Sequence, residues 1–157
     1  MELSIIQLVF SVFPEGLLIS YVGLGLVGIK LKVIDYIKIS IIDMTFLIVV
    51  IDILKLYGLH VILGILFWSV VFKVIVKIEW ELALIASLLA YILLFLGELI
   101  LATILSYWQF EVISFINGDN LIKFMSYSYL SKVPLLVPAV MIYWGDINLF
   151  KSYGLKR

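Results

Sequence analysis

The sequence predicts an all-α fold, a polytopic membrane helix bundle with about five transmembrane helices. Hydrophobic residues make up 65% of the 157 positions, and the mean hydropathy is +1.25. Charged residues make up only 14% of the chain, whereas an average soluble domain carries about 25%. A bilayer accommodates this much apolar surface because a helix satisfies its own backbone hydrogen bonds. We therefore expect residues 1–157 to form a single transmembrane helical domain.

The first expected span covers residues 3–29. The chain start before it carries an acid, Glu2, whereas a signal peptide begins with positive charge, and the apolar run is too long for a signal core. We therefore interpret it as a retained span. Pro14 removes a backbone donor and Gly16 loosens the next turn, so the segment Pro14-Glu15-Gly16 predicts a helix break, either a kink or a re-entrant turn.

The second and third spans are expected at residues 37–57 and 60–76, with a tight turn at Gly58 between them. The fourth covers residues 82–108. Aromatic rings prefer the headgroup level, and we place four of them near the span ends: Trp68, Trp80, Tyr107 and Trp108.

Residues 109–125 are less apolar and contain the turn-forming run Asn117-Gly118-Asp119-Asn120, which predicts a loop with a short interfacial helix. The fifth span is expected at residues 127–144 and contains Pro134 and Pro138. The alternative is a four-span bundle in which this proline-rich segment lies on the membrane surface.

The distribution of Lys and Arg predicts an outside N-terminus and an inside C-terminus, because cytoplasmic loops retain the excess of positive charge. Eight of these residues fall on the inside of a five-span bundle and three on the outside. The inside residues are Lys30, Lys32, Lys38, Lys73, Lys77, Lys151, Lys156 and Arg157, and the outside residues are Lys55, Lys123 and Lys132.

Two acids interrupt otherwise apolar runs, Glu15 and Glu98. An ionisable side chain at membrane depth costs about 2.5 to 3.5 kcal/mol on insertion scales, so each needs a physical reason. Facing each other in a bundle, the two could share a proton or accept one cation. The more ordinary interpretation is that each is protonated or hydrogen-bonded and fixes helix packing, because no intramembrane positive partner is evident for either.

Asp43 and Asp52 lie in the second span, nine residues apart, which places them on opposite faces of one helix. They cannot form a carboxylate pair. For Asp52 we expect an interfacial ion pair with Lys55, and for Asp43 an anchoring role near Lys38 at the cytoplasmic interface. His60, the only histidine, could sense pH, but capping of the following helix is the more ordinary role.

Small residues line the first span. Gly23, Gly25 and Gly28 follow Gly16 and allow close helix approach in membranes, although a strict G-x-x-x-G is missing. Internal packing is the default interpretation, and dimerisation through this face is the alternative.

Several functional classes are excluded by residue content. The absence of cysteine excludes disulfides and thiol nucleophiles, and with one histidine it leaves no zinc-ligand set, so we expect no metal and no cofactor. Net charge is zero and no basic stripe exists, which argues against nucleic acid as a partner. No nucleophile, base and orienting group can be assembled, so we expect no enzyme.

The order of features in the first hundred residues resembles the multi-span N-terminal sensor domains of bacterial GHKL-type histidine kinases, the class that includes peptide-pheromone receptors. The resemblance covers residues 8–106 and rests on Phe13-Pro14-Glu15-Gly16, on Tyr57-Gly58-Leu59-His60 and on Glu98 within residues 93–100. It implies a membrane domain that feeds a cytoplasmic kinase. These 157 residues hold no phospho-acceptor region or ATP-binding domain, so the resemblance implies a sensor domain or a stand-alone relative.

Three functions therefore remain open. The first is a sensor or scaffold in the bacterial cytoplasmic (inner) membrane, acting by helix contact with another membrane protein or by self-association within the lipid bilayer. The second is a small transporter or transporter subunit that uses Glu15 and Glu98 at a midplane site. The third is an anchor subunit whose polar residues only specify assembly.

Overall fold

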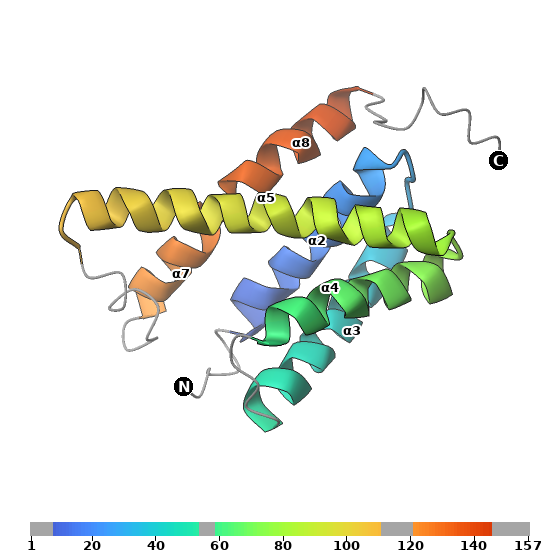
Figure 1. Ribbon diagram of the computed structural model, residues 1–157, viewed down its shortest axis with the longest axis horizontal. Helices are drawn as coiled ribbons and strands as arrows, with labels where there is room; N and C mark the ends of the chain where they lie inside the picture. The colour runs from blue at the N-terminus through green and yellow to red at the C-terminus, as the bar shows by residue number, and fades with distance from the viewer. Residues whose placement is uncertain (1–7, 54–58, 111–120, 146–157) are drawn as a thin grey trace.

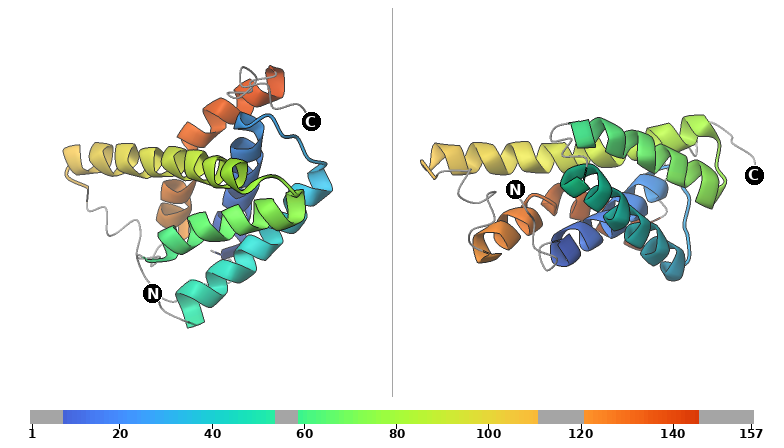
Figure 2. Two further views of the ribbon diagram at one scale, coloured as in Figure 1. Left: turned by 45° about the vertical axis from the view of Figure 1, so that its right-hand side comes forward. Right: turned by 90° about the horizontal axis from the view of Figure 1, so that it is seen from below.

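The computed structural model describes residues 8–53, 59–110 and 121–145, and within these ranges the protein is helical and contains no strand. This confirms the all-α prediction for the described residues. The long helix α5 (Trp80–Tyr107) crosses the molecule (Figures 1 and 2). The helices of residues 13–26 and 59–76 pack around its first half, and the helix of residues 121–130 lies beside its second half. The C-terminal half of α5 projects beyond α2 (Phe13–Leu26), α3 (Val33–Leu47) and α4 (Leu59–Val71) in every view.

The first helical segment consists of a π-helical stretch, η1 (Leu8–Val12), followed directly by α2 (Phe13–Leu26). The sequence predicts a break at Pro14, and the structure places the change from π to α geometry at that point without interrupting the span. Proline is tolerated there because the Phe10 carbonyl, four residues before Pro14, accepts a hydrogen bond from the Tyr129 hydroxyl at 2.8 Å instead. The segment stays continuous from Val9 to Leu26.

Gly28 ends this span by adopting a left-handed backbone, with φ of 82°. The Gly28 N–H donates to the Gly25 carbonyl at 3.0 Å, and the Ile29 N–H donates to the Leu24 carbonyl at 2.8 Å. These two bonds satisfy carbonyls that the helix end would otherwise leave unpaired. Gly28 is therefore a helix-terminating residue and not part of a packing face.

The second and third expected spans are each an α-helix that continues as a π-helix. They are α3 (Val33–Leu47) with η2 (Ile48–Ile53), and α4 (Leu59–Val71) with η3 (Phe72–Val76). α2 contacts α3, α5 and α8, whereas α4 packs mainly against α5. α2 is therefore the central helix of the bundle, and α4 lies at one side.

The last expected span, residues 127–144, is not a single helix. α7 (Leu121–Leu130) and α8 (Val133–Trp144) meet at an angle of 48°. Pro134 lies in the first turn of α8 and cannot donate an N–H to extend α7 into α8. The sequence contains two prolines in this region, but only the structure shows where the helix bends and by how much.

Small residues set the helix spacing in the core. A Cβ added at Gly23 on α2 would lie 2.7 Å from the carbonyl oxygen of Ala86 on α5, so the two backbones nearly touch. A Cβ at Gly25 would lie 2.8 Å from the Ile142 side chain on α8. The glycine face of the first span is thus covered by the protein's own helices, in agreement with internal packing and not with a dimer face.

Trp68 departs from its expected place near the headgroup level. Its exposed fraction is 0%, and its ring packs against Phe72 with centroids 5.3 Å apart. Trp80, Tyr107 and Trp108 are exposed at the two ends of α5, as expected for interfacial anchors. The position of Trp68 within α4 therefore reflects core packing.

Two helices in the described part are long and apolar enough to cross a membrane, residues 9–26 and 80–107, and the bent pair α7 and α8 makes three if it counts as one span. The segment at residues 61–76 is apolar but shorter. α3 and η2 together carry Asp35, Lys38, Asp43 and Asp52. Membrane association follows from length and composition, and the five-span count stays a prediction.

A candidate functional site at the helix breaks

A buried ion pair joins the first helix to the break between α7 and α8. The Lys132 Nζ lies 3.2 Å from Glu15 Oε2, and the two side chains are 3% and 25% exposed. The sequence analysis found no positive partner for Glu15, and that interpretation is wrong. The assignment of Lys132 to the outside stays a prediction. Lys132 is brought inside because the helix bend at residues 131–132 turns its side chain toward η1 and α2.

The three donors of the Lys132 ammonium all have acceptors. Besides Glu15, the Nζ donates to the Ser11 carbonyl at 3.2 Å and to Ser128 Oγ at 2.5 Å. Ser128 Oγ also lies 2.5 Å from Ser11 Oγ. A lysine has three donors and no acceptor, so this set satisfies the buried cation completely. Tyr129 adds a bond to the Phe10 carbonyl at 2.8 Å, which further ties α7 to η1.

Glu98 lies on α5 beside this ion pair and interacts electrostatically with both Glu15 and Lys132. The structure therefore brings the two predicted intramembrane glutamates to one region, with Lys132 near both. No hydrogen bond or ion pair joins the Glu98 carboxyl to any residue within the described ranges. Its half-buried side chain borders a groove between α5 and α7 instead.

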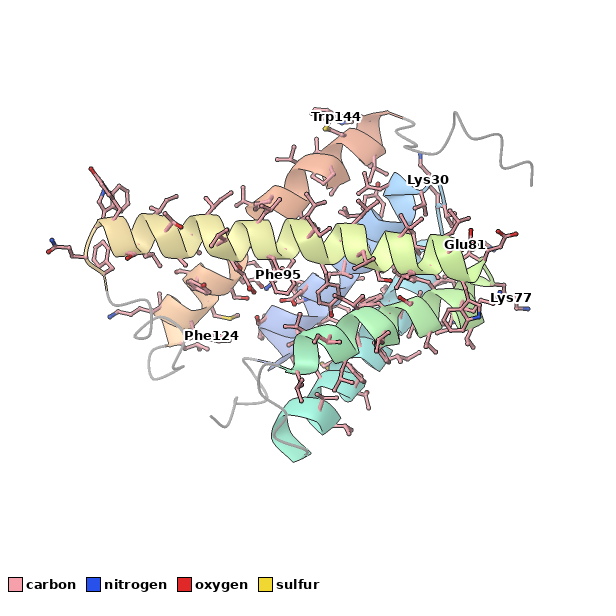
Figure 3. All side chains as sticks on the ribbon, in the orientation of Figure 1. Lys30, Lys77, Glu81, Phe95, Phe124 and Trp144 are labelled. Carbon is pink, nitrogen blue, oxygen red and sulfur yellow. The ribbon has the colours of Figure 1, made fainter. Side chains whose placement is uncertain are left out.

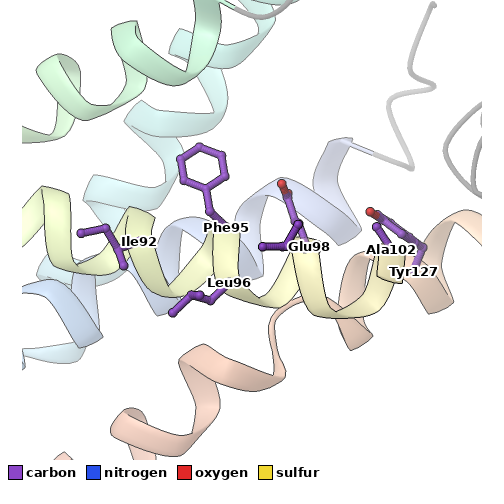
Figure 4. A pocket seen from close by; sticks show the side chains of 7 residues that line it. Ile92, Phe95, Leu96, Glu98, Ala102 and Tyr127 are labelled. Carbon is purple, nitrogen blue, oxygen red and sulfur yellow. The ribbon is translucent and has the colours of Figure 1, made fainter. Parts of the chain in front are cut away.

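The groove has a volume of about 540 Å³. The Glu98 carboxyl and the Phe95 ring project to the same side of α5, and the Tyr127 hydroxyl of α7 points toward Glu98 (Figure 4). Its remaining lining is apolar, with Ile92, Leu96, Leu99 and Ala102. Among the described residues, the Glu98 carboxyl is thus the one charged group in an otherwise apolar groove lining, which faces out of the bundle.

Asp43 lies in the interior of the bundle. Its exposed fraction is 2%, and a Cβ added at Gly16 would lie 3.0 Å from its Oδ2. Lys38, its expected neighbour, pairs with Asp35 at 3.8 Å on the exposed side of α3. The absence of a side chain at Gly16 gives the Asp43 carboxyl its place against α2, and the carboxyl interacts electrostatically with Glu15.

Trp68 and Tyr91 complete this interior cluster. Tyr91 lies close enough to Trp68 and Asp43 to interact with both, and the Trp68 indole N–H also approaches the Asp43 carboxyl. The geometry falls short of a hydrogen bond, because the buried Trp68 Nε1 has no hydrogen-bond partner among the described residues. Gly64 on α4 admits the Tyr91 hydroxyl, which a Cβ there would overlap. Glu15 and Asp43 therefore lie in two adjoining polar regions of the core.

For two predicted site residues, the structure describes the backbone and not the side chain. Asp52 lies in η2 and His60 in the first turn of α4, and their side chains lie outside the described residues, as does Lys55. The run Asn117–Asn120 also lies outside them. Within the described part of the chain, no group of three or more His, Asp or Glu side chains is arranged to hold a metal ion.

The sequence analysis missed several residues of this site: Ser11, Tyr91, Gly97, Ser128 and Lys132. The available signal was the position of Lys132 two residues before Pro134 inside an apolar stretch, which makes a loop at membrane depth plausible. Gly97 carried no signal, yet a Cβ there would overlap the Ser131 carbonyl oxygen. Close approach of α5 to the bend therefore depends on Gly97.

Comparison of the chain with protein families, with curated proteins and with solved structures finds no match. The functional interpretation therefore depends on the chain's own residues.

Proposed function

We propose that this protein is a non-enzymatic, multi-pass component of the bacterial cytoplasmic membrane that senses or scaffolds through helix contacts with a partner membrane protein. In this proposal the bundle has five spans, with the N-terminus outside and the C-terminus inside. The resemblance of residues 8–106 to kinase sensor domains supports the same class. The partner would carry any catalytic activity.

The proposal is supported by the contrast between an internally paired acid, Glu15, and the largely exposed apolar helix α5. The Glu15 charge is neutralised inside the fold by Lys132, as expected for acids that specify packing. α5, in contrast, is only 22% buried along its most apolar window, and its C-terminal half extends past the bundle (Figure 1). The part of this apolar face that none of the described helices covers is available to lipid and to a second membrane helix.

A transporter is the second candidate, and one observation favours it. A broken helix, α7 and α8, carries a charged residue at its break, next to two glutamates, and transporters build midplane sites from such discontinuous helices. The closed Glu15–Lys132 pair argues against it, because an ion or substrate would have to displace Lys132 from three acceptors.

The first test is purification of the tagged protein in mild detergent, followed by mass spectrometry of stoichiometric partners. Ile100 and Ile104 are exposed one turn apart on α5, and Val137 and Met141 are exposed one turn apart on α8. We expect Ile100→Ala with Ile104→Ala to release at least half of the partner, and Val137→Ala with Met141→Ala to release little. A protein that purifies alone would refute the proposal, and proton- or ion-coupled uptake by reconstituted vesicles would replace it with transport.

A further inference from the structure

The groove beside Glu98 has the shape and chemistry of a small-molecule site. Ligand pockets occupy about 300 to 1,000 Å³ and combine apolar walls with a few polar groups, and this groove has about 540 Å³ with the Glu98 carboxyl and the Tyr127 hydroxyl as its polar groups. Phe95 supplies an aromatic face next to the carboxyl (Figure 4).

Among the described residues, no ion pair is formed by Glu98. The Lys132 charge acts on Glu98, but its ammonium donates to Glu15, Ser11 and Ser128, which accounts for its three N–H donors. The apolar neighbours of Glu98 make solvation by water poor, and an unpaired acid in such surroundings costs free energy. A cation entering the groove would recover that cost by pairing with the carboxyl.

The depth and length of the groove limit what the occupant can be. Glu98 lies nine residues before Tyr107 on α5, about 13 Å along the helix axis, so a lipid headgroup held at the level of Tyr107 does not reach it. Residues 92–102, which line the groove, span about 15 Å, about half of the roughly 30 Å of hydrocarbon that a membrane-crossing helix spans. Both lengths favour a small molecule with an apolar portion.

A more polar groove leads to this site. It shares Ala102 with the first groove and continues past Thr103, Ser106 and Tyr107 to the end of α5. Hydroxyl groups along this wall can accept hydrogen bonds from an ammonium group as it moves from the headgroup level toward Glu98. The two grooves together provide an entry path and an end point.

We propose that the groove between α5 and α7 binds an amphipathic cation, an amine or guanidinium joined to a single apolar chain or ring. The charged group pairs with Glu98 and hydrogen-bonds to Tyr127, and the apolar part lies against Phe95, Leu96 and Leu99. This inference names a ligand class for the proposed sensor and so rests on the proposed function, but its test does not use the partner protein.

The test uses a photoreactive dodecylammonium probe and the full chain in phosphatidylcholine nanodiscs. We expect saturable cross-linking to residues 92–102 or Tyr127, competed by unlabelled dodecylammonium and not by dodecanol. Glu98→Gln should lower the labelling at least tenfold, and Tyr127→Phe two- to fivefold. Glu81→Gln is the matched control, because Glu81 lies on the same helix at its far end, near Lys77 (Figure 3), and it should leave labelling unchanged.

Several outcomes would overturn the ligand proposal. These are labelling that never saturates, equal competition by dodecanol, or equal labelling of Glu98→Gln. Competition by added phosphatidylethanolamine instead of dodecylammonium would assign the groove to a lipid headgroup and refute the single-chain ligand. If Glu98→Gln fails to fold, as judged by its elution profile and helical circular dichroism, Tyr127→Phe decides. Labelling without a co-purifying partner would refute only the proposed function, and a partner without specific labelling would refute only the ligand.

Discussion

Lys132 shows how one residue inside an apolar stretch gains a structural role from its surroundings. A buried ammonium is costly unless its charge is paired and its donors are satisfied. Here Glu15, the Ser11 carbonyl and the Ser128 hydroxyl provide both. The pair joins residues more than a hundred positions apart, so it connects the first helix to the end of the bundle.

Removing one member of this pair should cost more stability than removing both. Glu15→Gln leaves a Lys132 cation that is 3% exposed without its carboxylate, and we expect a loss of about 2 kcal/mol. The double variant Glu15→Gln with Lys132→Met should be more stable than Glu15→Gln alone, because it buries no unpaired charge. The midpoint of dodecyl-sulfate unfolding, followed by circular dichroism, measures both. A double variant less stable than Glu15→Gln would contradict the pairing.

Gly97 and Gly25 should differ sharply in their tolerance of alanine. A Cβ at Gly97 would overlap the Ser131 carbonyl oxygen, which is backbone and cannot move without shifting the α7–α8 bend. A Cβ at Gly25 meets only the flexible end of Ile142. We expect Gly97→Ala to lose about 3 kcal/mol and Gly25→Ala under about 1 kcal/mol, measured by thermal unfolding in detergent. Similar losses for the two variants would contradict the close approach of α5 to the bend.

At the scale of elements, the bend between α7 and α8 positions the site. Pro134 prevents α8 from continuing α7, and the 48° bend turns Lys132 inward and places Tyr127 opposite Glu98 across the groove (Figure 4). η1 meets α7 through the Ser11–Ser128 and Tyr129–Phe10 contacts. The ion pair and the groove therefore share α7 as a common wall.

This arrangement predicts a specific cross-link. Ser11 and Ser128 face each other with their Oγ atoms 2.5 Å apart, so cysteines at both positions lie within the reach of a disulfide. The chain has no native cysteine, and we expect Ser11→Cys with Ser128→Cys to form one bond under mild oxidation, seen as a mobility shift without reductant. Ser20→Cys with Ser128→Cys, placed farther along α2, should not. Equal cross-linking of the two pairs would show that η1 does not dock on α7.

For the whole molecule, orientation is a prediction of the Lys and Arg count. Eight of these residues fall on the expected inside and three on the expected outside, and Lys132, one of the three, is buried in the bundle. Positive charge in cytoplasmic loops sets orientation, so we expect an N-out and C-in bundle.

Single cysteines in the cysteine-free chain test this orientation. With an impermeant maleimide on intact cells, we expect labelling of Lys123→Cys, and of Lys73→Cys only after the cells are opened. A fusion of green fluorescent protein after Arg157 should be fluorescent, because it folds in the cytoplasm. Labelling of Lys73→Cys on intact cells would contradict the orientation, and a non-fluorescent fusion would favour the four-span alternative.

The sequence by itself determined the class of molecule and the positions of most helices. Apolar runs and their polar interruptions are local properties, so they predicted α5 within two residues of its observed start. They also marked the acids Glu15 and Glu98 as features that need a physical reason. Only the tertiary structure decided what those acids meet. Lys132, Ser128 and Gly97 are distant in sequence from Glu15, and their proximity depends on the bend of α7 and α8, which no local pattern specifies. The same holds for Trp68, whose full burial is a property of the packed bundle and not of its own segment.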